Sequence, residues 1–253
     1  MRPKALPNAL VIGEPAYEAL ARAELERWRG TMLKRPSLFG RAARGVQIRI
    51  NHAIPERVHA AVTATIEGLT RVIVTGSELT NARPLMDAAL SERETEVRRR
   101  IAAYRAVAAA QGGVAGAGGF ALALAEFPTL LATKIKLLFD IAALYGRDTR
   151  QLPERLYILG VFQLAFSSAD HRRAVLESME GWDAHASEHP RSPDDVDWRR
   201  FQQEYRDYID LAKLAQLIPV IGAPVGAVVN YRLLDWLGET AMNAYRMRWF
   251  AER

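Results

Sequence analysis

The sequence predicts an all-α protein, a single helical bundle domain of about eight helices built around two Gly-rich helical hairpins. Three observations support this fold class. Apolar residues recur at helical spacing over most of the chain, and no strand–turn–strand alternation occurs anywhere. Two long segments, 106–125 and 214–229, carry almost no charge and are punctuated by glycines. The rest of the chain is strongly charged, so we expect these two segments to organise the bundle.

Prolines and glycines mark most of the expected helix boundaries. Pro15 suits a first helical turn, other prolines open later helices, and Gly146 and Gly181 follow helical patterns as C-terminal stops. The clearest period of 3.6 residues follows Pro55. The expected helices, in order, are 14–29, 36–54, 55–76, 85–104, 128–146, 153–166, 171–181, 198–219 and 230–250.

The helix over 85–104 is dense in charge, and its ionisable side chains are most simply interpreted as a solvated face. They are Glu92, Arg93, Glu94, Glu96, Arg98, Arg99 and Arg100. The segment 181–198 is rich in Asp, Pro and Ser and predicts an acidic loop.

Each uncharged segment contains a GxxxG pattern, Gly112 with Gly116 and Gly222 with Gly226. This spacing places both glycines on one helical face, where a second backbone can approach closely. Alanine and glycine dominate the first segment, and the second is short and contains two prolines. Buried helical hairpins are therefore favoured over membrane spans.

Composition limits the chemistry. The 253 residues suffice for a sizeable core. The chain has no cysteine, which excludes disulfides, thiolate metal sites and cysteine nucleophiles. The first residues lack the apolar region of a secretory signal.

A basic strip distinguishes the N-terminal part, since residues 27–55 hold seven Lys or Arg and no acid, in a chain of net charge +5. Cations above an apolar stripe are typical of helices that bind anionic membrane surfaces. A solvated face is the alternative, and nucleic acid is disfavoured because no recognition module accompanies the strip. The expected membrane-binding residues are Lys34, Arg35, Leu38, Phe39, Arg41, Arg44 and Arg49.

Two groups of charged residues are candidates for a polar site within the bundle. Asp207, Asp210 and Lys213 follow one another at three-residue spacing, so they share a helical face. Asn230, Asn243 and Arg246 of the last helix are their expected partners. The second group, Glu126, Lys134, Lys136 and Asp140, interrupts an apolar hairpin and is most simply a set of ion pairs at the edge of the bundle.

Three shorter patterns are interpreted structurally. GAGGFA at 116–121 fits a dinucleotide fingerprint but follows a helix rather than a strand. Ser168, Asp170 and His171 suit a helix cap. His185 and His189 have a zinc-compatible spacing but lie in the acidic loop. We therefore expect no cofactor and no metal.

Three blocks carry a family resemblance: IPERVHAAVTATIEG at 54–68, GAGGFALALAEFPTLLATKIKLLFDIAALYG at 116–146, and the long block from YRDYIDLAKL to NAYRMR at 205–248. From about residue 37 onward the chain resembles the EcsC family of bacterial proteins. The resemblance implies a helical protein working at or near the cytoplasmic membrane, and it supplies no catalytic residue.

The functional expectation is a non-enzymatic helical protein, peripheral to the inner face of the cell membrane, that handles lipid or assists a transporter. Its expected partners are an anionic membrane surface and a membrane protein or transporter. Residues 1–35 would form a peripheral N-terminal helix and 36–253 the EcsC-like domain. The alternatives are a hydrolase with a carboxylate site at Asp207 and Asp210, and a soluble protein-interaction scaffold.

Overall fold

The computed structural model describes residues 13–33, 56–75, 84–117, 119–168, 171–195 and 223–253. Within these ranges it contains seven α-helices, one short 3-10 helix and no β-strand, so the predicted all-α helical bundle is confirmed. The predicted helices over 36–54 and 198–219 lie outside the described residues.

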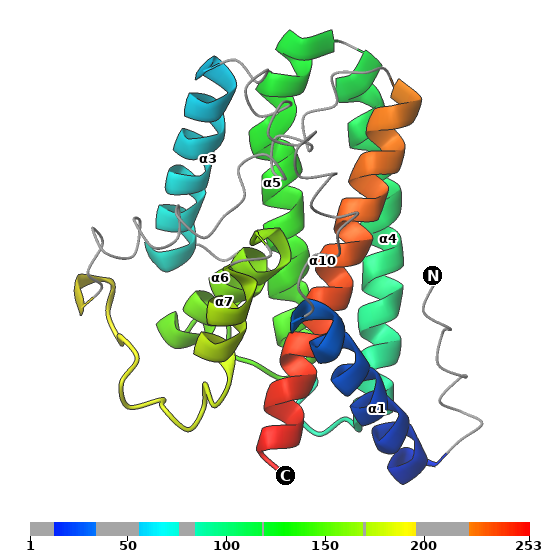
Figure 1. Ribbon diagram of the computed structural model, residues 1–253, viewed down its shortest axis with the longest axis vertical. Coiled ribbons are helices and arrows are strands. Elements are labelled where there is room, and N and C mark those ends of the chain that lie inside the picture. Colours follow the sequence, from blue (N-terminus) through cyan, green and yellow to red (C-terminus); the bar gives the residue numbers. More distant parts are fainter. Residues whose placement is uncertain (1–12, 34–55, 76–83, 118, 169–170, 196–222) are drawn as a thin grey trace.

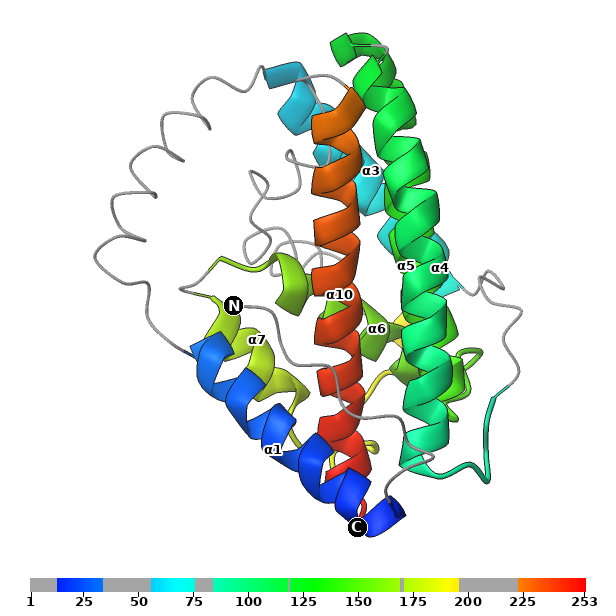
Figure 2. The same cartoon turned by 90° about the vertical axis from the view of Figure 1, so that its right-hand side faces the viewer.

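Three long helices form the centre of the molecule: α4 (Leu90–Ala117), α5 (Gly119–Leu144) and α10 (Ala223–Ala251). They lie side by side, and α4 runs antiparallel to both α5 and α10 (Figures 1 and 2). Contact is most extensive between α10 and α4, next between α4 and α5, and much smaller between α10 and α5.

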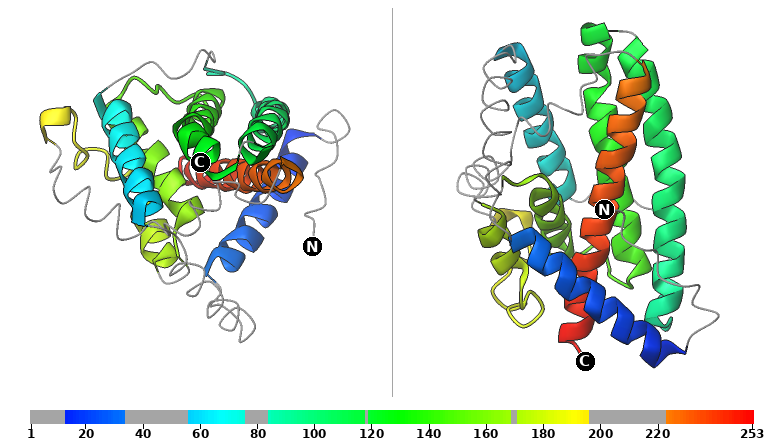
Figure 3. Two further views of the ribbon diagram at one scale, coloured as in Figure 1. Left: turned by 90° about the horizontal axis from the view of Figure 1, so that it is seen from above. Right: turned by 45° about the vertical axis from the view of Figure 1, so that its right-hand side comes forward.

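Shorter helices surround the half of this bundle that contains the C-terminus. Helix α1 (Glu14–Leu33) crosses α10 and α4, while α6 (Leu152–Phe166) and α7 (Arg172–Met179) cover another side (Figure 3). Helix α3 (Glu56–Thr75) packs on α5 and α6 and lies beside the opposite half of the bundle, where α5 and α10 begin (Figure 1). The acidic loop contains turns and the 3-10 helix η1 (Pro193–Asp195).

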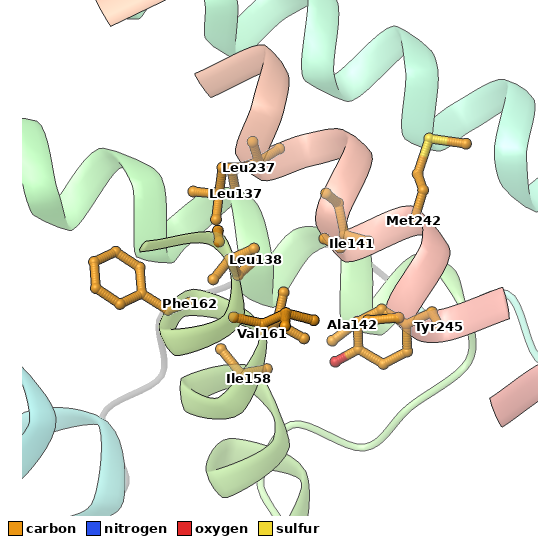
Figure 4. Close-up of a cluster of buried hydrophobic side chains, with 14 of the residues drawn as sticks. Leu137, Leu138, Ile141, Ala142, Ile158, Val161, Phe162, Leu237, Met242 and Tyr245 are labelled. Atoms are coloured by element: carbon orange, nitrogen blue, oxygen red, sulfur yellow. The ribbon is translucent and has the colours of Figure 1, made fainter. Parts of the chain in front are cut away.

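The core lies where α5, α6 and α10 meet. Leu138 of α5, Phe162 of α6 and Leu237 of α10 are all buried in this cluster (Figure 4). Helix α6 has apolar residues on nearly all sides, as expected for a helix that other helices enclose.

Several helices are longer than the sequence predicts. Helix α4 continues to Ala117, through Gly112 and Gly113, because its alanine-rich sequence favours the helix more than two glycines oppose it. Helix α5 begins at Gly119 rather than at Pro128, which lies exposed within the helix. A proline there forgoes one intrahelical hydrogen bond, a loss that the rest of the helix tolerates.

The structure describes only some of the glycines that are predicted to lie at close helix contacts. Gly112 is buried in α4, Gly116 and Gly226 lie within α4 and α10, and Gly222 lies outside the described residues. Their role in close packing stays a prediction. Gly238 does mark a close approach, because a Cβ atom there would lie 2.7 Å from Cδ1 of Ile101 on α4.

Candidate functional site

Charged side chains that the sequence pattern assigns to solvent lie inside the bundle, so the prediction of a uniformly solvated face on α4 is wrong. Glu94 and Arg93 are buried, whereas Glu92 and Arg99 are exposed. The reason is that α1 and α10 cover one side of the first half of α4, and charges on that side must find partners.

Glu94 is the centre of the largest buried polar cluster. Arg246 donates to both of its carboxylate oxygens, each at 2.6 Å, and Arg98 donates at 3.0 Å. Tyr17 and Tyr145 donate their hydroxyl protons to the same carboxylate at 2.7 and 3.1 Å. Burial alone would raise the pKa of Glu94, but the hydrogen bonds and charge of Arg246 outweigh burial and lower it.

The same cluster attaches α1 to the bundle. Nη1 of Arg246 also donates to Glu24 of α1 at 3.0 Å and to Asn243 at 3.2 Å. Every strong donor and acceptor around Glu94 is thus occupied by protein, which is the arrangement of a structural ion-pair network. Arg246 and Asn243, expected to serve Asp207 and Asp210, belong to this network.

A second ion-pair cluster ties α10 to α6 and to the acidic loop. Arg248 donates to Glu154 at 2.6 Å and to Asp183 at 2.7 Å, and its guanidinium carbon lies 4.5 Å from the ring centre of Tyr157. Tyr245 donates its hydroxyl proton to Glu154 at 2.7 Å. These groups satisfy one another and form no open site.

The candidate carboxylates on α5 do not share one site. Asp140 is buried, with Arg100 at 3.1 Å and the Tyr104 hydroxyl at 2.9 Å. Glu126 is partly exposed and precedes Asp140 by fourteen residues of α5, which correspond to about 21 Å of helix. Asp207, Asp210 and Lys213 lie outside the described residues. The hypothesis of a carboxylate site at Asp207 and Asp210 therefore stays a prediction.

Lys134 differs from all of these groups. Its side chain is 0% exposed on α5, and its ammonium donates to the carbonyl of Leu130 at 3.2 Å and to Oδ1 of Asn230 on α10 at 3.0 Å. Both partners are neutral, and within the part of the chain that the structure describes no carboxylate lies within ion-pair distance of Lys134. Burial lowers the pKa of the Lys134 ammonium to about 7.

The two described acceptors of the Lys134 ammonium do not use all of its hydrogen-bond donors. An ammonium has three donors, and two have protein acceptors. Its sequence neighbours Leu130, Leu131 and Leu138 are all buried, so the surroundings are apolar. A buried cation among apolar groups is costly unless a counter-charge reaches it, which makes the Lys134–Asn230 pair the candidate functional site.

A second distinctive feature is the end of the bundle where α4 finishes and α5 and α10 begin (Figure 1). Large apolar side chains are exposed on all three helices along the half of the bundle that leads to this end, and we call this set the apolar tip. Val114 of α4 is the most exposed at 63%. The apolar tip consists of Val107, Val114, Leu122, Val228 and Tyr231.

The described contacts of the histidine and serine motifs are local. Ring nitrogens of His185 and His189 lie 3.0 and 2.9 Å from the backbone carbonyls of Gly181 and Trp182. Ser168 Oγ lies 3.0 Å from Nδ1 of His171, at the start of α7. Among the described residues, no three His, Asp or Glu side chains group as metal ligands.

Two further expectations concern the membrane. No helix among the described ranges is both long and apolar enough to cross a bilayer. The basic strip begins in α1, where Arg29 pairs with Glu180. Its predicted membrane-binding residues, from Lys34 to Arg49, lie outside the described residues and stay a prediction.

Comparison with known proteins places the chain among bacterial relatives. The model of the EcsC protein family matches residues 19–250. Protein EcsC of Bacillus subtilis (strain 168) is 41% identical over 226 residues, covering 89% of this chain and 93% of the relative. The uncharacterized protein YdbA of the same organism is 32% identical over 146 residues, covering 58% and 54%. No solved structure matches.

Proposed function

We propose that this chain, which belongs to the EcsC protein family, is a non-enzymatic helical protein acting at the inner surface of the cytoplasmic membrane. The observation that carries this proposal is the apolar tip. Isolated apolar residues are common on protein surfaces, but a group gathered at one end of a bundle is typical of an interaction site.

Charge distribution favours a lipid surface as the occupant of the tip. Residues 106–125 contain no ionisable side chain, so the last turns of α4 and the first turns of α5 can enter the boundary between headgroups and acyl chains without dehydrating a charge of their own. Arg232 lies just beyond the second uncharged segment, where it can reach anionic headgroups. Tyr231, an amphipathic aromatic residue, suits the interface itself.

The predicted basic strip would act together with the tip. Each Lys or Arg near an anionic leaflet contributes about 1 kcal/mol of attraction, so the strip supplies electrostatic attraction while the tip supplies apolar burial. A transporter or other membrane protein would then be a partner met at the same surface.

Flotation with liposomes tests the proposal. Val114→Asp and Val228→Asp should each reduce the bound fraction severalfold, because a carboxylate at the interface opposes insertion. The matched control is Met86→Asp, since Met86 is 66% exposed at the opposite end of α4. Circular dichroism should show unchanged helicity for all three variants.

The outcomes separate the competing functions. Loss of flotation in the tip variants alone supports membrane binding through the tip. Equal flotation of Val114→Asp, Val228→Asp and wild type would assign binding elsewhere, for instance to the basic strip. Absence of flotation in the wild-type protein would overturn the proposal and favour a scaffold that binds a protein partner at the tip.

A further inference from the structure

The Lys134–Asn230 pair has an unmet electrostatic requirement. Lys134 is wholly buried, and its two hydrogen-bond acceptors, a backbone carbonyl and an amide oxygen, carry no charge. Arg246 and Arg248, two buried cations of α10, differ from Lys134 of α5 because each faces carboxylates within 3 Å. Among the described residues, no carboxylate lies within ion-pair distance of Lys134, so the described part of the fold leaves this lysine without a counter-charge.

The number of donors indicates what would supply the counter-charge. One positive charge and one remaining N–H match a single monoanionic oxygen group. A phosphate dianion would need several more donors than this site presents. A carboxylate fits both the charge and the hydrogen-bond count.

The surroundings indicate what the carboxylate is attached to. The side chains flanking Lys134 along α5, Leu130, Leu131, Leu137 and Leu138, are apolar and buried. From the start of α5 at the tip to Lys134 is fifteen residues, or about 22 Å. An acyl chain spans one leaflet, about half of a hydrocarbon core roughly 30 Å thick, so an extended chain covers most of that distance.

We propose that Lys134 and Asn230, facing each other between α5 and α10, form the headgroup site for the carboxylate of a long-chain fatty acid. The chain extends from Lys134 toward the apolar tip. Helices α5 and α10 have the least contact among the three long helices, so they separate with the smallest loss of packing. The inference rests on the proposed function in one respect, that a membrane supplies the acid.

Binding of monomeric oleate to the delipidated full chain tests the site. Wild type should bind oleate, and Lys134→Met should bind it about tenfold more weakly or worse, because the charge-assisted hydrogen bond is lost. Oleyl alcohol, which keeps the chain but lacks the charge, should bind both proteins equally and weakly. Acetate, which keeps only the carboxylate, should bind neither.

Lys136→Met is the matched control, since Lys136 is a partly exposed lysine of the same helix. It should bind oleate as wild type does. Equal oleate affinity in Lys134→Met and wild type, equal affinity for oleate and the alcohol, or no oleate binding would each overturn the inference. Thermal melting of Lys134→Met establishes that the variant is folded.

The experiment separates this inference from the membrane proposal. Oleate is presented in solution, so Val114→Asp should retain oleate binding at Lys134 even where it loses flotation. Conversely, Lys134→Met should float with liposomes as wild type does. Failure of oleate binding with intact flotation would remove the fatty-acid site and leave membrane binding in place.

Discussion

Replacing Lys134 by methionine should change the dependence of stability on pH. In the folded protein, burial lowers the pKa of Lys134 from 10.5 to about 7. Between these two values the unfolded chain holds the proton and the folded chain has released it. Because the unfolded state then binds more protons, the free energy of unfolding contributed by this group rises with pH.

The magnitude follows from the two pKa values. At pH 7 the folded amine is half protonated, and at pH 9 it is almost entirely neutral, while the unfolded amine stays charged. Integrating the proton difference gives a rise of about 2 kcal/mol in unfolding free energy between pH 7 and pH 9. Methionine has nearly the same length and no charge, so Lys134→Met should lack this increment.

Urea denaturation of the delipidated protein, followed by circular dichroism at pH 7, 8 and 9, measures the effect. The wild-type curve should rise relative to that of Lys134→Met by about 2 kcal/mol over this range. All other titrating groups are common to both proteins and cancel in the comparison. Lys136→Met should follow wild type. Parallel curves for wild type and Lys134→Met would refute the burial of an uncompensated amine.

Three further predictions concern the bundle. Gly238→Ala should lower the unfolding free energy by about 1–2 kcal/mol in chemical denaturation, because the clash with Ile101 exceeds the gain in helix propensity. Adding Ile101→Val to this variant should restore part of the lost stability. A Gly238→Ala variant more stable than wild type would contradict the close approach of α10 and α4. Glu94→Gln should destabilise by about 3 kcal/mol at pH 7 because Arg246 loses its buried partner. Since the pKa of Glu94 is lowered in the fold, this contribution is present above the unfolded pKa and is lost on acidification, so the difference between wild type and variant should shrink below about pH 4. Gly146→Ala should lower the melting temperature by several degrees because φ is 82° there, and an unchanged melting temperature would contradict that backbone conformation.

The fold could be predicted because its signals are local. The period that follows Pro55 and the stops at Gly146 and Gly181 correspond to helix boundaries in the structure. The continuation of α4 to Ala117 was missed because helix ends in Ala- and Gly-rich sequence depend on packing rather than on a cap.

Burial of the charged side chains could not be predicted from local sequence. The charge pattern of residues 92–100 is equally consistent with side chains in solvent and with side chains in buried ion pairs. Which side of this helix is buried depends on α10, about 150 residues later in the chain. Lys134 did carry a usable signal, since it shares a helical face with the apolar Leu130, Leu131 and Leu138. A charged residue on that face either is buried or marks the end of the apolar face. Because apolar residues of α5 continue on both sides of Lys134, this pattern favours burial.

The distribution of charge along the bundle links the two proposed sites. Around Glu94 and Glu154, ion pairs join α10 to α1, α4, α6 and the acidic loop, so separation there would expose buried charges. Toward the tip, α5 and α10 are joined through Lys134 and Asn230 by a single hydrogen bond between described side chains. No described ion pair joins α5 directly to α10 in this half, where the ion pair Arg105–Asp235 joins α4 to α10. Separation of α5 from α10 therefore costs mainly apolar contact, and local opening should be confined to this half. The proposed entry of an acyl carboxylate requires two features: an exposed apolar surface at one end, and below it a buried lysine with no carboxylate within ion-pair distance among the described residues.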